Sequence, residues 1–121
     1  MKKKDGLMRF FFYYIWHIRT DKRCAICGKP LKGEISSTYF DHLLEKSKYP
    51  EIKYLEDNIL LVCPDHHTDK TNGFPHPTHK KAIDKFYKKY IKNKEYYIQK
   101  NDELVEEILK PLKNSLNGKL Q

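Results

Sequence analysis

The sequence predicts a small α+β domain, and three features of the 121-residue chain indicate this class. Two short runs, 36–44 and 59–62, are rich in β-branched, aromatic or aliphatic residues and have the length of strands. Apolar residues at intervals of three and four mark amphipathic helices after them. Two pairs of closely spaced metal-binding side chains accompany the strands, and a metal would stabilise a chain too short for a large core. We therefore expect a single domain over residues 1–121.

The segments around the first strand are expected to be a helix and a loop. Residues 7–19 have the length of a helix, although their unbroken aromatic run leaves the periodicity ambiguous. They belong to a basic and aromatic N-terminal segment, residues 1–23. The stretch 45–57 contains charged residues, Ser47 and Pro50 without a sustained period, which predicts a loop.

Helices are expected after the second strand. Pro64 suits the first turn of a short helix, where its missing N–H is not needed, and Gly73 suits its end. A helix over 79–92 follows two prolines, and its apolar residues recur at helical spacing. A last helix over 102–116 has leucine and isoleucine side chains in one row, and Pro111 is expected to bend it.

Basic residues are concentrated at the two ends of the chain. Residues 1–23 carry 7 basic and 2 acidic side chains, residues 24–79 carry 6 and 8, and residues 80–121 carry 11 and 6. Basic flanks around a slightly acidic centre are expected of a protein that binds a polyanion while its centre holds a cation, although a solvated lysine-rich surface is the alternative. The lysines expected to contact nucleic acid in the basic C-terminal helices, 79–121, are Lys81, Lys85, Lys88 and Lys89.

The composition argues against a secreted or membrane protein. Three cysteines do not suit a disulfide framework, so they are metal ligands or inert thiols. Arg9 interrupts the apolar run near the N-terminus, and no small-residue cleavage site follows, so a secretory signal is not expected. No uncharged apolar stretch of roughly 18 residues exists. We expect an intracellular protein without a membrane span.

Four side chains have the spacing of a structural zinc site. Cys24 and Cys27 form a C-x2-C pair, and Cys63 and His66 form a C-x2-H pair. Two such pairs can complete a tetrahedron around zinc without an open position, so the site is expected to be structural. It would join a knuckle at the first pair to the start of the short helix and add folding energy. Buried thiols without a metal are the alternative.

The same region resembles the HNH nuclease family, the ββα-metal nucleases. The resemblance covers residues 24–72 and leaves both flanks unexplained. Besides the cysteine pairs, it depends on three motifs, which are Asp41-His42-Leu43, Asn58-Ile59-Leu60-Leu61-Val62-Cys63 and His66-His67-x2-Lys70. It implies a ββα-metal core with a zinc knuckle, flanked here by an N-terminal helix and C-terminal helices.

The resemblance also implies roles for four residues. His42 would be the general base, Asp41 and His67 would bind the catalytic divalent ion, Mg²⁺ or a similar metal, and Asn58 would fix the loop and orient His42. A histidine of ordinary pKa can take a proton from water at neutral pH. A cation held by a carboxylate and an imidazole can offset charge on a phosphate. Lys70 is a further candidate for phosphate binding.

Two departures from the family pattern and one geometric requirement qualify the resemblance. The fourth zinc position is usually cysteine and here is His66, although the spacing from Cys63 assigns this residue, not His67, to zinc. Thr68 and Glu45 replace an asparagine and a proline that are frequent in the family. Adjacent strand residues point to opposite faces, so Asp41 and His42 can share one metal site only where the strand bends or ends.

Other polar residues carry weaker expectations. Lys48, Tyr49 and Tyr54 in the loop are candidates for substrate contact. His76 and His79 follow prolines and are expected to be surface or capping groups, and His17 has no evident partner.

The expected function is hydrolysis of DNA phosphodiester bonds, leaving 5′-phosphate and 3′-hydroxyl ends. The DNA would be double-stranded or branched, and so small a chain could need a second copy or a partner protein. The alternatives are a zinc-ribbon module that binds nucleic acid without catalysis, and an RNA-directed nuclease or toxin.

Overall fold

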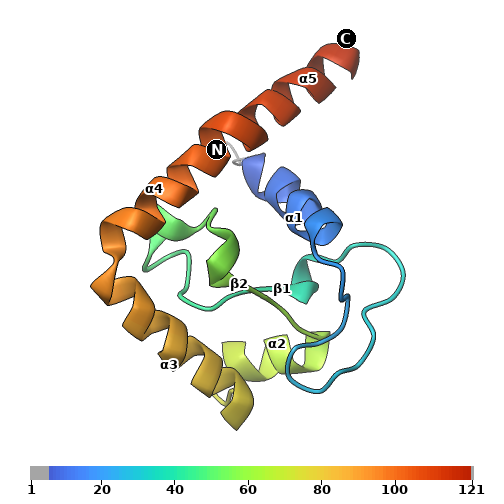
Figure 1. Cartoon of the computed structure of the whole chain (residues 1–121). Helices are drawn as coiled ribbons and strands as arrows, with labels where there is room; N and C mark the ends of the chain where they lie inside the picture. Colours follow the sequence, from blue (N-terminus) through green and yellow to red (C-terminus); the bar gives the residue numbers. More distant parts are fainter. Residues whose placement is uncertain (1–5, 121) are drawn as a thin grey trace.

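The centre of the molecule is a ββα unit. The computed structural model describes the backbone of residues 6–120 and the side chains of residues 6–115 (Figure 1). Strands β1 (Phe40–His42) and β2 (Ile59–Leu61) are antiparallel, with Asp41 opposite Leu60, and α2 (Pro64–Thr71) follows β2. In Figure 1 this hairpin lies between α1 and α2. The expected α+β class and ββα core are confirmed.

Helix α1 (Leu7–Ile18) covers the hairpin with its aromatic side chains. Phe11 and Ile15 are fully buried, and Phe12 stacks on Phe40 with ring centroids 4.5 Å apart. Burying an aromatic side chain contributes about 1.5–3 kcal/mol, so this contact explains why an ambiguous aromatic run becomes a helix. The N-terminal helix is therefore confirmed from Leu7, while residues 1–5 of the expected segment lie outside the described residues.

Helices α3 (Pro77–Lys92) and α4 (Lys94–Leu104) build a second core. Phe86, Tyr90 and Tyr97 pack with Leu44 and Ile52 from the loop that follows β1. The loop is therefore held between the hairpin and the C-terminal helices.

The expectation of a strand over 36–44 was too long. The side chain of Ser36 accepts a hydrogen bond from the backbone N–H of Thr38, and Ser37–Tyr39 forms a 3₁₀ turn. Serine and threonine compete in this way with the strand's own hydrogen bonds, so pairing begins only at Phe40. The loop 45–57 contains two further 3₁₀ turns.

The last helical region begins earlier than expected. Helix α4 starts at Lys94 instead of 102, and it continues through a π turn, Val105–Leu109, into α5 (Lys110–Leu120). The π turn ends two residues before Pro111 and includes Glu107, the residue four positions earlier, whose carbonyl a proline ring would meet in a regular α-helical turn. Figure 1 shows α4 and α5 in one line, so the bend expected at Pro111 is not seen, and the π turn accommodates the proline ring instead. The Leu116 side chain lies outside the described side chains.

Among residues 6–120, no helix has the combination of length and hydropathy that crossing a bilayer requires.

Candidate active site and metal centre

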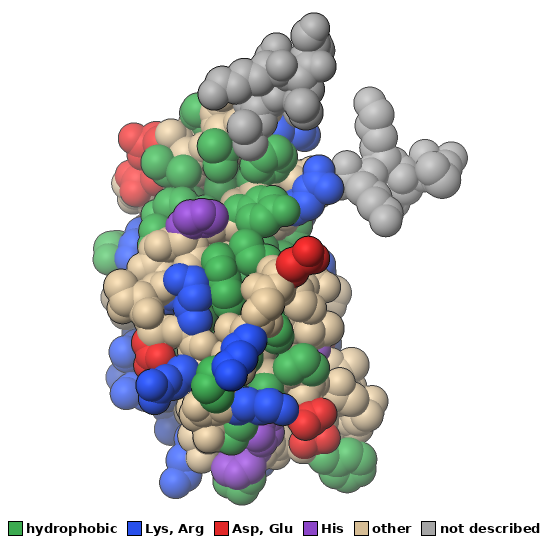
Figure 2. Space-filling view, turned by 90° about the vertical axis from the view of Figure 1, so that its right-hand side faces the viewer, with side chains coloured by type: hydrophobic (Ala, Val, Ile, Leu, Met, Phe, Trp, Pro, Cys, Tyr) green, Lys and Arg blue, Asp and Glu red, His purple; other side chains and the backbone are tan. Residues whose placement is uncertain are grey.

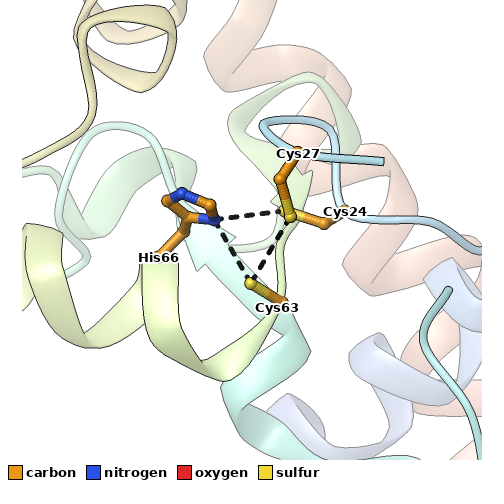
Figure 3. A group of neighbouring side chains, drawn as sticks. All are labelled: Cys24, Cys27, Cys63 and His66. Carbon is orange, nitrogen blue, oxygen red and sulfur yellow. Dashed lines mark hydrogen bonds between the residues drawn. The ribbon is translucent and has the colours of Figure 1, made fainter. Parts of the chain in front are cut away.

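Four side chains converge in the arrangement expected of a tetrahedral metal site (Figure 3). The Cys27 and Cys63 sulfurs are 3.9 Å apart, and Nδ1 of His66 lies 3.2 Å from the Cys63 sulfur and 3.7 Å from the Cys24 sulfur. A tetrahedron with Zn–S distances of about 2.3 Å has edges of about 3.8 Å, so these separations leave room for one zinc ion. The cluster fits the expected zinc site, with Nδ1 as the ligand atom of His66.

The backbone around the first cysteine pair favours a thiolate. Burial raises the pKa of the Cys24 thiol, but backbone N–H groups of Cys27, Cys63 and Ile26 and the His66 side chain outweigh burial and lower it to about 6. Gly28 has a φ of 78°, which closes the knuckle in a conformation that suits glycine. Because the thiolate is the form that binds metal, this environment prepares a ligand.

A separate pocket of about 530 Å³ lies beside the zinc cluster, between α1, β1 and α2. Asp41, His42 and His67 all line it, as does Lys70. Strand β1 ends at His42, and the side chains of Asp41 and His42 reach the same pocket although they are neighbours in the strand. His66 and His67 serve different places, since only His66 faces the cysteines.

His42 is held in one orientation by a backbone carbonyl. Its Nε2 lies 2.9 Å from the carbonyl oxygen of Lys53, which must accept a hydrogen from this nitrogen. In the neutral ring Nδ1 is then left as an acceptor. The rings of Phe11 and Phe12 lie within 6.5 Å of the imidazole centroid. Burial lowers the pKa of His42 below 6.5, against the opposing effects of the Lys53 carbonyl and Asp41.

Asp41 is buried, and each of its carboxylate oxygens has a partner. Nζ of Lys70 lies 2.8 Å from Oδ1, and Nε2 of His79 lies 2.7 Å from Oδ2. Burial raises the pKa of the carboxyl group, but His79 and Lys70 outweigh it and hold this pKa below its usual value. The group is therefore an anion in the fold.

The donor set around Asp41 suits a hard divalent cation. The Oδ1 atom already holds a cationic ammonium group, and His67 offers an imidazole to the same pocket. A carboxylate and an imidazole bind such an ion while leaving positions for water and phosphate. Asp41 and His67, the two ligands implied by the family resemblance, both line this pocket and remain candidates for holding the ion.

Asn58 fixes the loop after β1 from inside the protein. Its side chain is fully buried, with Oδ1 accepting from the backbone N–H of Leu44 at 2.8 Å and Nδ2 donating to the Leu44 carbonyl at 3.0 Å. The backbone carbonyl of Asn58 accepts from Leu43. Asn58 thus closes the base of the loop 45–57, which carries Lys53, the hydrogen-bond partner of His42.

Comparison with known proteins supports the family suggested by the sequence. The family model described as HNH endonuclease matches residues 24–73. The matched segment is an HNH domain. It contains the zinc cluster, the hairpin and α2, while α1, α3, α4 and α5 lie outside it. Searches of curated proteins and of solved structures gave no significant match.

Replacement of Asn58 by alanine is expected to destabilise the HNH domain by about 2–4 kcal/mol, because buried backbone groups of residue 44 lose their partners. The loop that carries the Lys53 carbonyl would also loosen around His42. Urea unfolding measures the first effect. Asp57→Asn is the control, since its side chain is 39% exposed, and equal losses in the two variants would contradict the role of Asn58.

The structure changes the expectations for several residues near the HNH domain. His79, expected to be a surface or capping group, is fully buried against Asp41. No spacing signal pointed to it, because it lies outside the HNH motif. His76 does cap α3. Tyr54 is buried in the core and cannot be a substrate contact, and Tyr49 packs against Tyr90. Lys48 is exposed.

The lysines expected to contact nucleic acid fall into two groups. Lys70 points inward, with 13% of its side chain exposed, and binds Asp41. The four lysines of α3, which are Lys81, Lys85, Lys88 and Lys89, are exposed. On the face seen in Figure 2, lysine and arginine side chains are spread among hydrophobic and acidic ones.

Proposed function

We propose that this protein is a metal-dependent endonuclease that hydrolyses DNA phosphodiester bonds, with His42 as general base. One observation carries the proposal: Asp41, His42 and His67 of the HNH domain line one pocket, and the Lys53 carbonyl leaves Nδ1 of His42 as the proton acceptor. Zinc in the cysteine cluster would be structural.

His42 would remove a proton from the attacking water. Water attacks phosphorus, its proton passes to Nδ1 of His42, and the 3′-oxygen leaves and is protonated by solvent, which gives 5′-phosphate and 3′-hydroxyl ends. A positioned general base typically contributes about 10²–10⁴-fold to the rate. The phenylalanine rings beside the imidazole keep it neutral, since burial disfavours its charged form.

Asp41 and His67 would bind one divalent ion, Mg²⁺ or a similar metal, in the pocket that both line. Such an ion offsets the charge that develops on the phosphate. The exposed lysines of α3 and the basic flanks would bind phosphates away from the scissile bond.

Single-turnover assays on end-labelled substrates test this function and its substrate class. Zinc-loaded protein is mixed with duplex DNA, branched DNA and RNA in the presence of Mg²⁺ or Mn²⁺. Cleavage of DNA that leaves 5′-phosphate ends is expected. Cleavage restricted to RNA would replace this proposal with an RNA-directed nuclease, and binding without cleavage would replace it with a zinc-ribbon module.

The cleavage rate is expected to fall when the pH drops below 6.5. Protonated His42 cannot accept a proton, and burial lowers its pKa from 6.5, so the active neutral form persists to lower pH than for an exposed histidine. The rate should rise with pH, be half-maximal below pH 6.5 and reach its plateau by about pH 7.5. Initial rates at saturating metal measure this profile. A midpoint above pH 7 would contradict the role of burial.

A further inference from the structure

We propose that His79, in the first turn of α3, is a positioning residue that orients Asp41 for binding the catalytic ion. This inference depends on the proposed function. His79 lies outside residues 24–73, the segment matched by the HNH model. Its side chain is fully buried, and its Nε2 is 2.7 Å from Oδ2 of Asp41, whose side chain is 4% exposed.

The two oxygens of Asp41 face different surroundings. Lys70, the partner of Oδ1, lines the pocket together with Asp41, whereas His79, the partner of Oδ2, is not among the residues that line it. An ion that enters from the pocket therefore meets Oδ1. Lys70 also donates to the carbonyl oxygen of His42 at 2.5 Å, so it would keep one partner when an ion replaces it at Oδ1, while His79 stays on the far oxygen and fixes the plane of the carboxylate.

The His79 ring directs its hydrogen bond to Asp41. Among the described residues, its Nδ1 is buried without a hydrogen-bond partner, so Asp41 receives the hydrogen bond that the ring makes. Burying a polar ring with one nitrogen unsatisfied costs stability. A purely structural position would be filled at lower cost by an apolar side chain, which favours a role toward Asp41.

Helix α3 holds the ring rigidly. Pro77 begins the helix, and the side chain of His76 accepts a hydrogen bond from the backbone N–H of Thr78. Further along, Phe86 and Tyr90 anchor α3 in the second core. The position of Asp41 is thus set by a helix outside the ββα unit. Removing a group that hydrogen-bonds to a metal ligand typically weakens metal binding by about 10–100-fold.

The test compares His79→Leu, which cannot donate, with His79→Gln, whose amide can. Mn²⁺ alone is titrated into zinc-loaded protein and followed by electron paramagnetic resonance. His79→Leu should weaken Mn²⁺ binding about 10–100-fold, and His79→Gln should restore most of the affinity. Tyr90→Phe is the matched control. Tyr90 is on the same helix as His79, and the change removes its part-buried hydrogen bond to Glu51 without touching Asp41. The Mn²⁺ affinity of this variant should equal that of the wild type.

Several outcomes would overturn the inference. The first is a folded His79→Leu variant that binds Mn²⁺ with wild-type affinity. The second is an equal loss of Mn²⁺ affinity in His79→Leu, His79→Gln and Tyr90→Phe, which would indicate general destabilisation. If His79→Leu does not fold, the ¹⁵N shift of the His79 ring in wild-type protein decides, because Mg²⁺ binding at Asp41 should move it at the same concentration that supports cleavage. A wild type that cleaves with Mg²⁺ while this shift stays constant refutes the role of His79 alone. A wild type that neither binds Mn²⁺ nor cleaves refutes the proposed function itself.

Discussion

Removal of zinc from the cysteine cluster is expected to unfold the HNH domain. The cluster joins the knuckle to the start of α2, and Cys24 and Cys63 lie within the main core. Structural zinc contributes about 10–16 kcal/mol of apparent binding energy in zinc-finger peptides, whereas a whole domain is stable by only about 5–15 kcal/mol. Chelation, or Cys63→Ser, should therefore abolish the cooperative thermal transition seen by circular dichroism, and Mg²⁺ should not restore it.

Adjacent histidines supply a matched control for this prediction. His66→Ala should lose the zinc, because Nδ1 of His66 faces the sulfurs. His67→Ala should retain one zinc per chain and a nearly unchanged melting temperature, because His67 faces the pocket. A Cys63→Ser protein with wild-type zinc content and stability would show that the thiols are inert.

Replacement of His42 by alanine is expected to lower the cleavage rate by about 10²–10⁴-fold. Among the described residues that line the pocket, His42 is the only histidine with a ring nitrogen hydrogen-bonded to a backbone carbonyl, and the variant removes this ring. The chain should stay folded, since His42 is only partly buried and its neighbours Phe11 and Phe12 remain packed. Single-turnover cleavage, with zinc content and circular dichroism checked in parallel, measures the loss.

His17→Ala is the control for His42→Ala, because His17 is an exposed ring on α1 that contacts the carbonyl of Tyr13. It should cleave like the wild type. If His42→Ala kept its rate while remaining zinc-loaded and folded, another group would be the base.

The sequence predicted the parts of the site that follow from local spacing. The paired intervals of the zinc ligands and the motif around Asp41 and His42 depend on residues close in the chain, and the structure brings them together as the spacing implied. The separation of His66 from His67 also followed from the helical turn, since successive helical side chains point about 100° apart.

Features that depend on tertiary packing were not predictable in this way. His79 lies 38 residues from Asp41, and only the placement of α3 brings it to the carboxylate. Tyr54 sits among loop residues in the sequence but is buried by Phe11 at a ring distance of 5.6 Å. The extent of β1 was set by side-chain capping at Ser36, which strand propensity does not capture.

The measurement that tests the central claim most directly is the cleavage of supercoiled plasmid by zinc-loaded wild-type protein, with and without Mg²⁺ or Mn²⁺. Nicked or linear product that requires the added ion is the result expected of a pocket in which Asp41 and His67 bind a divalent cation beside His42. Plasmid that is bound but stays supercoiled with every divalent ion would contradict the claim and leave a zinc module that only binds nucleic acid.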